Sequence, residues 1–198
     1  MTTLLVFTRN FAMRQAIQGL SSADRAVFFF DNRLEFIVCA TILDKPCILI
    51  DAIDETTDNI GWLYSRLAAR GLSRRTYFIS PEENTGNSYL KLFWLVTTIK
   101  ELKALCDRAA KLPTTEKSWE IADVIYDRLS EKLSAEHLDF LMTLYDASTG
   151  EYRCNDRDDI NKNYYLRKRL ALGSSSEMKQ LIVILTTQAY HHPCLKSA

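Results

Sequence analysis

The segment Cys47-Ile48-Leu49-Ile50-Asp51 consists of four consecutive apolar residues followed by an acid. A continuous apolar run of this length is typical of a strand buried on both faces of a parallel sheet, because a half-exposed strand would alternate apolar and polar residues. Parallel neighbours are joined by crossover connections, which are usually helices. The segment therefore predicts an α/β fold in which residues 47–50 form an interior strand.

The sequence on both sides of this strand alternates short apolar runs with helical patterns. Further strands are expected at residues 4–8, 26–30, 76–79 and 92–96. Helices are expected near residues 13–20, 34–43, 60–67 and 99–106. Gly71 follows the third helical pattern, where it would end the helix as a left-handed cap. This alternation predicts a five-stranded, doubly wound parallel sheet over about residues 1–110.

Only helical patterns follow Pro113, which interrupts the α/β pattern. Residues 111–132 are interpreted as a linker helix region, and residues 133–190 as a second domain made of helices. The expected apolar stripes are Trp119, Ala122, Tyr126 and Leu129; then Leu138, Leu141, Met142 and Tyr145 after Ser134; and Met178, Leu181, Ile182 and Leu185. A basic helix is expected over about residues 158–170, while residues 148–159 are polar and follow no pattern that assigns a structure.

Composition and cysteine usage bound the class of protein. The chain has 198 residues with 25 basic and 25 acidic side chains, and no apolar run reaches the ~18 residues of a membrane span. No basic flank precedes a long apolar region at the start, so no signal peptide is expected. Five cysteines without close C-x-x-C spacing predict free thiols in a cytoplasmic protein. Residues 191–194 (His-His-Pro-Cys) have no distant ligand to complete a metal site, so we expect no metal and no other cofactor.

Charge is distributed unevenly along this neutral chain. Residues 112–159 hold 5 basic and 12 acidic side chains, whereas residues 160–198 hold 6 basic and 1 acidic side chain. Much of the later positive charge falls in Leu166-Arg167-Lys168-Arg169-Leu170, within the expected basic helix. A basic helix set apart in a neutral chain favours a phosphate-facing surface, although clustered Lys and Arg also occur on ordinary solvated helix faces.

The layout resembles two-domain response regulators of the LuxR/FixJ class, which join a receiver domain to a four-helix DNA-binding domain of helix-turn-helix type. The resemblance places Asp51 at the end of the third strand, where receivers have their phosphate-accepting aspartate. It places Ser80 after the fourth strand, where receivers have Ser or Thr. The resemblance therefore implies a receiver-like first domain over residues 1–110.

The second half resembles the DNA-binding domain of the same class at its two ends. Leu133-Ser134-Ala135-Glu136 resembles the family's opening helix, and residues 166–177 resemble the end of its recognition helix and the start of its last helix. Between them the family has a turn bounded by glycine and a scaffold helix, whereas residues 148–157 form a shorter stretch that has no apolar pattern. The size of the chain, its degenerate receiver and its irregular helix-turn-helix region are similar to those of fimbrial regulators in this class.

The receiver resemblance lacks parts that phosphorylation needs. Receivers hold Mg²⁺ with two acids after the first strand, where this chain has Thr8 and Arg9. They also place a lysine at the end of the fifth strand, whereas the nearest lysine here, Lys100, comes later. Phosphoryl transfer needs a divalent cation to offset the charge of the phosphoryl oxygens. Asp51 and Ser80 are therefore interpreted as vestiges of a phosphoacceptor site, and the chain is expected to resist phosphorylation.

A helical wheel at about 100° per residue separates the basic helix into two faces. Leu166, Leu170 and Ile160 are expected on the buried side. The outward residues are the candidate DNA contacts: Asn161, Lys162, Tyr165, Lys168 and Arg169. Lys and Arg of a major-groove helix meet phosphates, and Asn can read adenine. The acids Asp156, Asp158 and Asp159 at its start would repel phosphates, so weak autonomous binding is expected.

Together these patterns favour a transcriptional regulator that is not an enzyme and does not bind membranes. It would act through the major groove of DNA and pair as a homodimer, or as a heterodimer with another response regulator. Two alternatives stay open. One is an antagonist that binds a partner regulator without touching DNA. The other is a small metal-dependent α/β hydrolase built on Asp51 and Asp54. The sequence contains no glycine-rich phosphate loop and no nucleophile elbow that would support it.

Overall fold

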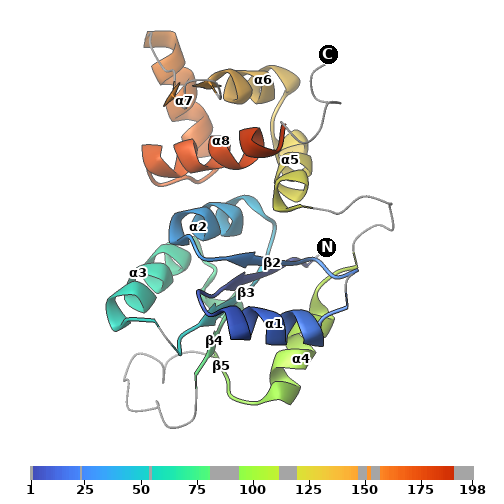
Figure 1. Cartoon of the computed structure of the whole chain (residues 1–198). Helices are drawn as coiled ribbons and strands as arrows, with labels where there is room; N and C mark the ends of the chain where they lie inside the picture. The colour runs from blue at the N-terminus through green and yellow to red at the C-terminus, as the bar shows by residue number, and fades with distance from the viewer. Residues whose placement is uncertain are drawn as a thin grey trace. The chain divides into compact units, whose positions relative to one another are not determined.

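The computed structural model describes residues 2–22, 24–53, 55–80, 94–111, 120–146, 151–152 and 157–189. The chain divides into two compact units, Met1–Ser118 and Trp119–Ala198. The first contains a parallel sheet covered by helices, and the second is mainly helical (Figure 1). Among the helices that the structure describes, none has the length and apolar character that crossing a membrane requires.

The sheet of the first unit has five strands that all run parallel. They are β1 Leu4–Phe7, β2 Val27–Phe30, β3 Cys47–Asp51, β4 Thr76–Ile79 and β5 Trp94–Val96, and their order is β2-β1-β3-β4-β5. Strand β1 pairs with both β2 and β3, so that Leu4 lies between Val27 and Cys47. All residues of β1 and β3 are buried, as their unbroken apolar sequences predict. The predicted five-stranded parallel sheet is confirmed.

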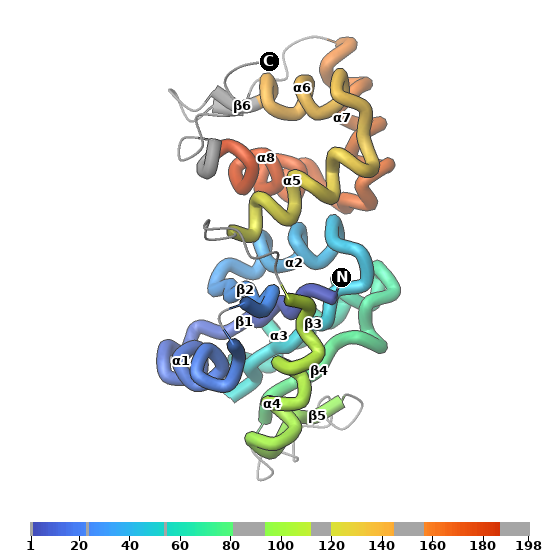
Figure 2. The backbone as a smooth tube through the Cα atoms, turned by 90° about the vertical axis from the view of Figure 1, so that its right-hand side faces the viewer, coloured from blue at the N-terminus to red at the C-terminus, as the bar shows by residue number. Residues whose placement is uncertain are grey.

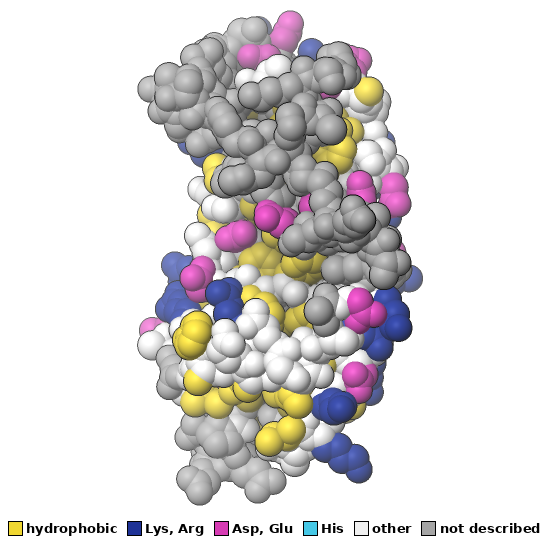
Figure 3. All heavy atoms as spheres, turned by 45° about the vertical axis from the view of Figure 1, so that its right-hand side comes forward, with side chains coloured by type: hydrophobic (Ala, Val, Ile, Leu, Met, Phe, Trp, Pro, Cys, Tyr) yellow, Lys and Arg dark blue, Asp and Glu magenta, His cyan; other side chains and the backbone are white. Residues whose placement is uncertain are grey.

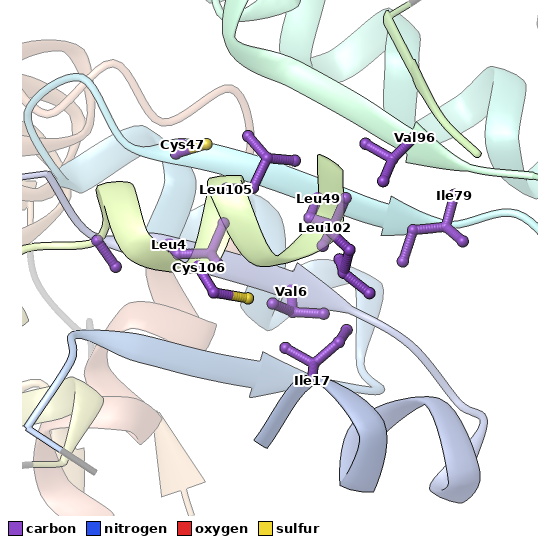
Figure 4. Close-up of a cluster of buried hydrophobic side chains, with 11 residues drawn as sticks. Leu4, Val6, Ile17, Cys47, Leu49, Ile79, Val96, Leu102, Leu105 and Cys106 are labelled. Carbon is purple, nitrogen blue, oxygen red and sulfur yellow. The ribbon is translucent and has the colours of Figure 1, made fainter. Parts of the chain in front are cut away.

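Helices cover both faces of the sheet, as a doubly wound fold requires. They are α1 Phe11–Leu20, α2 Arg33–Ile42, α3 Thr57–Ala68 and α4 Ile99–Arg108, with a 3-10 turn at Ser73–Arg75 before β4. On one face, Leu4, Val6 and Leu49 of the sheet pack with Ile17 of α1 and Cys106 of α4 (Figure 4). On the other face, Phe36 of α2 contacts the rings of Phe7 and Phe30 at centroid distances of 5.4 and 5.6 Å.

The second unit contains four described helices and a short two-stranded sheet. These elements are α5 Ile121–Lys132, α6 Ala135–Thr143, β6 Tyr145–Asp146, β7 Glu151–Tyr152, α7 Arg157–Arg169 and α8 Ser175–Ala189. Helix α8 packs against α5 and α6 (Figure 2). Its predicted stripe is buried as expected: Met178, Leu181, Ile182 and Leu185. Helix α5, which the sequence analysis assigned to a linker region, is thus packed within the second unit.

The sequence assigned no structure to residues 148–159 between α6 and α7, where the family that the chain resembles has a scaffold helix. Between α6 and α7 the structure has strands β6 and β7, which pair antiparallel with Tyr145 opposite Tyr152. Tyr145 was expected to extend the helical stripe of Leu138 and Leu141, but α6 ends at Thr143 and Tyr145 lies in a strand. The reason is visible in the sequence, because residues 148–157 offer no apolar residues at helical spacing that could be buried. Residues 147–150 and 153–156 lie outside the described part of the chain.

Two helices end in the same backbone motif with different residues at the key position. After α3, Leu72 N–H donates to Leu67 O at 2.9 Å, and Gly71 adopts φ 70°. After α7, Leu172 N–H donates to Arg167 O at 2.9 Å, and Ala171 adopts φ 57°. Both are Schellman caps, which need a left-handed residue. The predicted Gly71 cap is confirmed, whereas the α7 cap uses an alanine where glycine is favoured.

Candidate functional site

The carboxyl edge of the sheet, where the parallel strands end, holds the two residues expected to mark a former phosphoacceptor site. Asp51 is the last residue of β3, and Ser80 directly follows β4. The neighbouring backbones are joined, because Ala52 N–H donates to Ile79 O at 2.9 Å. Both residues are only 3% exposed. They therefore occupy neighbouring positions at one edge of the sheet, but with little access for a solution reagent.

Both carboxyl oxygens of Asp51 already accept hydrogen bonds. Thr8 Oγ1 donates to Asp51 Oδ2 at 2.8 Å in a buried contact. Ile53 N–H donates to Asp51 Oδ1 at 3.1 Å. The same Thr8 hydroxyl accepts from Asn10 N–H at 3.1 Å, which ties Asp51 to the start of α1. Asp51 thus links the ends of β1 and β3 and serves as a structural acceptor in this arrangement.

Arg9 follows β1 in the sequence, where receivers have one of the acids that hold Mg²⁺. Arg9 Nε is 3.6 Å from Glu55 Oε1, and the Glu55 side chain is only 6% exposed. Asn59 Nδ2 also donates to Glu55. A divalent cation would be repelled by Arg9 and would have to compete for carboxylates that are already bound. Within the described residues, no group of three or more His, Cys, Asp and Glu side chains is arranged to hold a metal ion. The residues present do not fit Mg²⁺.

A small pocket lies beside Ser80 rather than beside Asp51. Its volume is about 180 Å³, and its lining includes Ser80, Thr97, Thr98 and Ile99. All the lining residues that the structure describes are hydrophobic or carry a hydroxyl group. Lys100, the nearest candidate for the missing receiver lysine, lies exposed in the first turn of α4 and is not part of this lining. Among the described residues that line this pocket, no cationic side chain is present to hold a phosphoryl group.

Hydrophobic side chains reach the surface of the first unit. Yellow side chains are visible over the lower half of the face drawn in Figure 3. The most exposed large hydrophobic residues described in this unit are Phe11 at 73%, Ile99 at 73% and Trp94 at 64%. Side chains of this size at the surface are typical of interaction sites when they form a patch. These exposed side chains are therefore candidates for contact with the protein partner that the sequence analysis expects.

Helix α7 places the five candidate DNA contacts on its solvent side. These residues are all exposed: Asn161, Lys162, Tyr165, Lys168 and Arg169. Leu166 and Leu170 are 0% and 3% exposed, as the wheel predicts. The expectation for Ile160 was wrong, because it is 55% exposed. At about 100° per residue Ile160 lies roughly 80° from Leu170, at the margin of the buried face.

Three of the five candidates also contact neighbouring helices. Lys162 Nζ lies 5.5 Å from the centroid of the Phe140 ring, in α6. The Tyr165 ring stacks on His137 of α6 at 5.8 Å. Arg169 donates to Lys132 O, at the end of α5, at 2.8 Å and to Tyr165 Oη at 3.1 Å. These side chains help to hold α7 against α5 and α6.

Tyr164 is a candidate that the sequence analysis did not select. It is 51% exposed, and the cations Lys168 and Arg167 lie 4.9 and 5.7 Å from its ring centroid. A hydrogen bond with Lys168, together with the charge of that residue, lowers the pKa of the Tyr164 phenol. The i, i+4 spacing of Tyr164 and Lys168 is the signal that could have identified this pair.

The remaining sequence candidates have mixed outcomes. Asp158 is exposed and Asp159 is half-buried in the first turn of α7. Asp54, Asp156 and residues 191–194 (His-His-Pro-Cys) lie outside the described residues. Cys39, Cys47 and Cys106 are free and buried, in accord with the expected free thiols. Burial raises the pKa of all three thiols, that of Cys47 to about 11, which disfavours the reactive thiolate.

Comparison with known proteins adds no assignment. No protein-family model matches the chain, and no curated protein matches it. Two regions of the molecule bear on its function: the buried carboxyl edge of the sheet and the exposed basic face of α7.

Proposed function

We propose that the chain is a transcriptional regulator that contacts duplex DNA through α7 and uses its receiver-like unit for association. The observation that carries this proposal is the exposed basic face of α7 on a helix anchored by buried leucines. Thirteen residues make α7 about 20 Å long, and a helix of this kind fits the major groove, which is about 12 Å wide. The family resemblance supports the same role, and fimbrial genes are its expected class of target.

The receiver-like unit is proposed to work without phosphorylation. Asp51 is buried and hydrogen-bonded through both oxygens, and Arg9 stands where a metal-binding acid would be needed. Incubation with acetyl phosphate and Mg²⁺ should therefore leave the intact mass unchanged. A phosphate mapped to Asp51 by mass spectrometry would contradict this part of the proposal. Such a unit can contribute a surface that is always available for association, either with a second copy of the chain or with another regulator.

A partner-binding antagonist is the second candidate function. The exposed Phe11, Trp94 and Ile99 side chains favour it, because hydrophobic residues of this size are common in protein interfaces. It differs from the first candidate in one measurable respect. An antagonist would bind a partner regulator and show no salt-dependent affinity for DNA.

The deciding experiment is a titration of the full chain into a fluorescent duplex of mixed sequence at several salt concentrations. DNA contact predicts that log K falls linearly with log salt, by about 0.9 units for each phosphate contacted. The variant Arg157→Ala/Lys162→Ala/Lys168→Ala/Arg169→Ala removes the four exposed cations of α7 and should lose most of this slope. A control variant, Lys100→Ala/Lys103→Ala, removes two exposed cations from α4 and should keep the slope.

The same titration is repeated with any regulator recovered from cells by the tagged chain. Weak binding alone that becomes tight with the partner would support regulation through a heterodimer. Binding that is absent at low salt, with and without the partner, would refute DNA contact and favour the antagonist.

A further inference from the structure

Two parallel stripes run along the exposed side of α7. The outer stripe is Arg157, Asn161, Tyr164 and Lys168, and the inner stripe is Asp158, Lys162, Tyr165 and Arg169. Each follows a spacing of four, three and four residues, so each lies along one line of the helix surface. All eight side chains are exposed. Tyr164 at 51% and Tyr165 at 50% show that exposure alone does not separate the stripes.

Contacts do separate them. From the inner stripe, Lys162 lies over Phe140, Tyr165 stacks on His137, and Arg169 donates to Lys132 O. These partners belong to α5 and α6, so the inner stripe forms the seam between α7 and its neighbours. A side chain held in this way would have to exchange existing contacts for new ones on binding, which costs free energy.

Among the residues that the structure describes, the side chains of the outer stripe contact only other side chains of α7. Tyr164 is flanked by Lys168 and Arg167, which lie 4.9 and 5.7 Å from its ring centroid. The charges also differ between the stripes. The outer stripe has two cations and no acid, whereas the inner stripe pairs its two cations with Asp158. Asp158, one of the three acids expected to repel phosphates, therefore lies on the seam side of the helix.

We infer that the outer stripe is the surface of α7 that meets nucleic acid, with Tyr164 at its centre. This inference rests on the proposed DNA binding and narrows it to a different set of residues. The stripe spans eleven residue steps, or about 16 Å. Arg157 and Lys168, near its ends, contact phosphates on either side of the groove, while Asn161 and Tyr164 between them contact base edges or sugars. Tyr165 and Arg169 are positioning residues that fix the angle of α7.

The test compares variants that remove equal charge from the two stripes. The outer variant is Arg157→Ala/Lys168→Ala, and the inner variant is Lys162→Ala/Arg169→Ala. The probe is a fluorescein-labelled 25-base-pair duplex of mixed sequence, titrated with the full chain from 0.05 to 0.2 M salt. Circular dichroism and thermal unfolding check each fold. If the inner variant unfolds, the single variants Arg157→Ala and Lys162→Ala give the same comparison.

The outer variant is expected to lower the salt slope by about two units and to weaken binding at low salt by tenfold or more, since two phosphate contacts are lost. The inner variant should change the slope by less than one unit. Tyr164→Ala should weaken binding, whereas Tyr165→Ala should mainly lower the melting temperature. An inner variant that loses as much slope as the outer one would overturn the inference while leaving DNA binding intact. Wild-type protein that shows no salt-dependent binding would overturn the proposed function and the inference together.

Photo-crosslinking separates DNA from a protein occupant. Benzoylphenylalanine is placed at position 164 or at position 165 of the full chain in cells that express it. Crosslinks to DNA from position 164, and few from position 165, would support the inference. Crosslinks from position 164 only to protein would overturn it, because the outer stripe would then be a protein-binding surface.

Discussion

The carboxyl edge of the sheet and the exposed face of α7 both carry charged residues at positions that suggest a function, but their side chains are in opposite states. At the sheet edge, Asp51 is buried and both of its oxygens are bonded. On α7, Lys168 and Tyr164 are exposed and contact each other. A side chain can act on a ligand only if the ligand can reach it. The comparison therefore supports a structural role for Asp51 and agrees with the binding role proposed for α7.

The largest expected effect tests the structural role of Asp51. Asp51→Ala removes the acceptor of the buried Thr8 hydroxyl and of the partly buried Ile53 N–H, and should lower the free energy of unfolding by about 3 kcal/mol. Urea unfolding followed by circular dichroism measures this. Asp51→Asn keeps one acceptor oxygen and should lose clearly less. If Asp51→Ala is as stable as the wild type, the sheet edge is not closed in the way described and could still host chemistry.

The second effect is a pH dependence of the buried thiols. Burial raises the pKa of Cys47 from 9.0 to about 11, so below pH 9 the thiol is protonated in both states and its stabilising effect is fully present. Between pH 9 and 11 only the unfolded chain loses the proton, and stability falls by about 2 kcal/mol. In Cys47→Ala the drop in unfolding free energy across this range should be smaller by that amount. An unchanged drop would show that Cys47 is not buried as described.

A smaller effect comes from the caps after α3 and α7. Ala171 holds a left-handed conformation that favours glycine, so Ala171→Gly should stabilise the second unit by about 1 kcal/mol. Gly71→Ala is the matched change in the opposite direction and should destabilise the first unit by a similar amount. Its cost comes from the left-handed backbone alone, since the added methyl group would meet no other part of the structure within 4 Å. Melting temperatures that move in opposite directions would confirm that both caps form. A destabilising Ala171→Gly would place the end of α7, and with it the basic face, in doubt.

The smallest expected effect tests which side of α7 packs against the rest of the second unit. Tyr165→Ala removes a ring that stacks on His137 and should cost about 0.5–1.5 kcal/mol of stability. Tyr164→Ala removes a ring that lies against two cations of its own helix, Arg167 and Lys168. This change should leave the unfolding curve unchanged. Equal losses in the two variants would mean that both tyrosines pack into the unit and that α7 has no free face.

The sheet was predictable because its signals are local and strong. Four buried apolar residues in a row, as at residues 47–50, have few other solutions in a globular chain, and they fixed both the strand and its place inside the sheet. The Gly71 cap was predictable for a similar reason, since one residue type is favoured at a left-handed position. Helix α8 followed from a complete stripe of apolar residues.

The surface could be predicted only in part. The wheel separated buried Leu166 and Leu170 from the exposed residues, because that division depends on one helix alone. It could not show that Tyr165 contacts His137 or that Arg169 reaches Lys132, because those contacts depend on where α5 and α6 lie. Nor could it show that Thr8 would bind Asp51, 43 residues away. Partners distant in sequence decide which exposed residues are free, and no local pattern encodes them.

The strand order has a consequence for how the protein is made. Because β1 lies between β2 and β3, three neighbouring strands of the sheet are present once residue 51 has been synthesised. The next strand begins at Thr76, and at 5–20 residues per second the ribosome needs about 1–5 s to reach it. During that interval the apolar β3 is an unpaired edge, which is the kind of strand that promotes aggregation. A nascent chain in which β3 has left the ribosome and β4 has not is therefore the form that we expect to aggregate most readily.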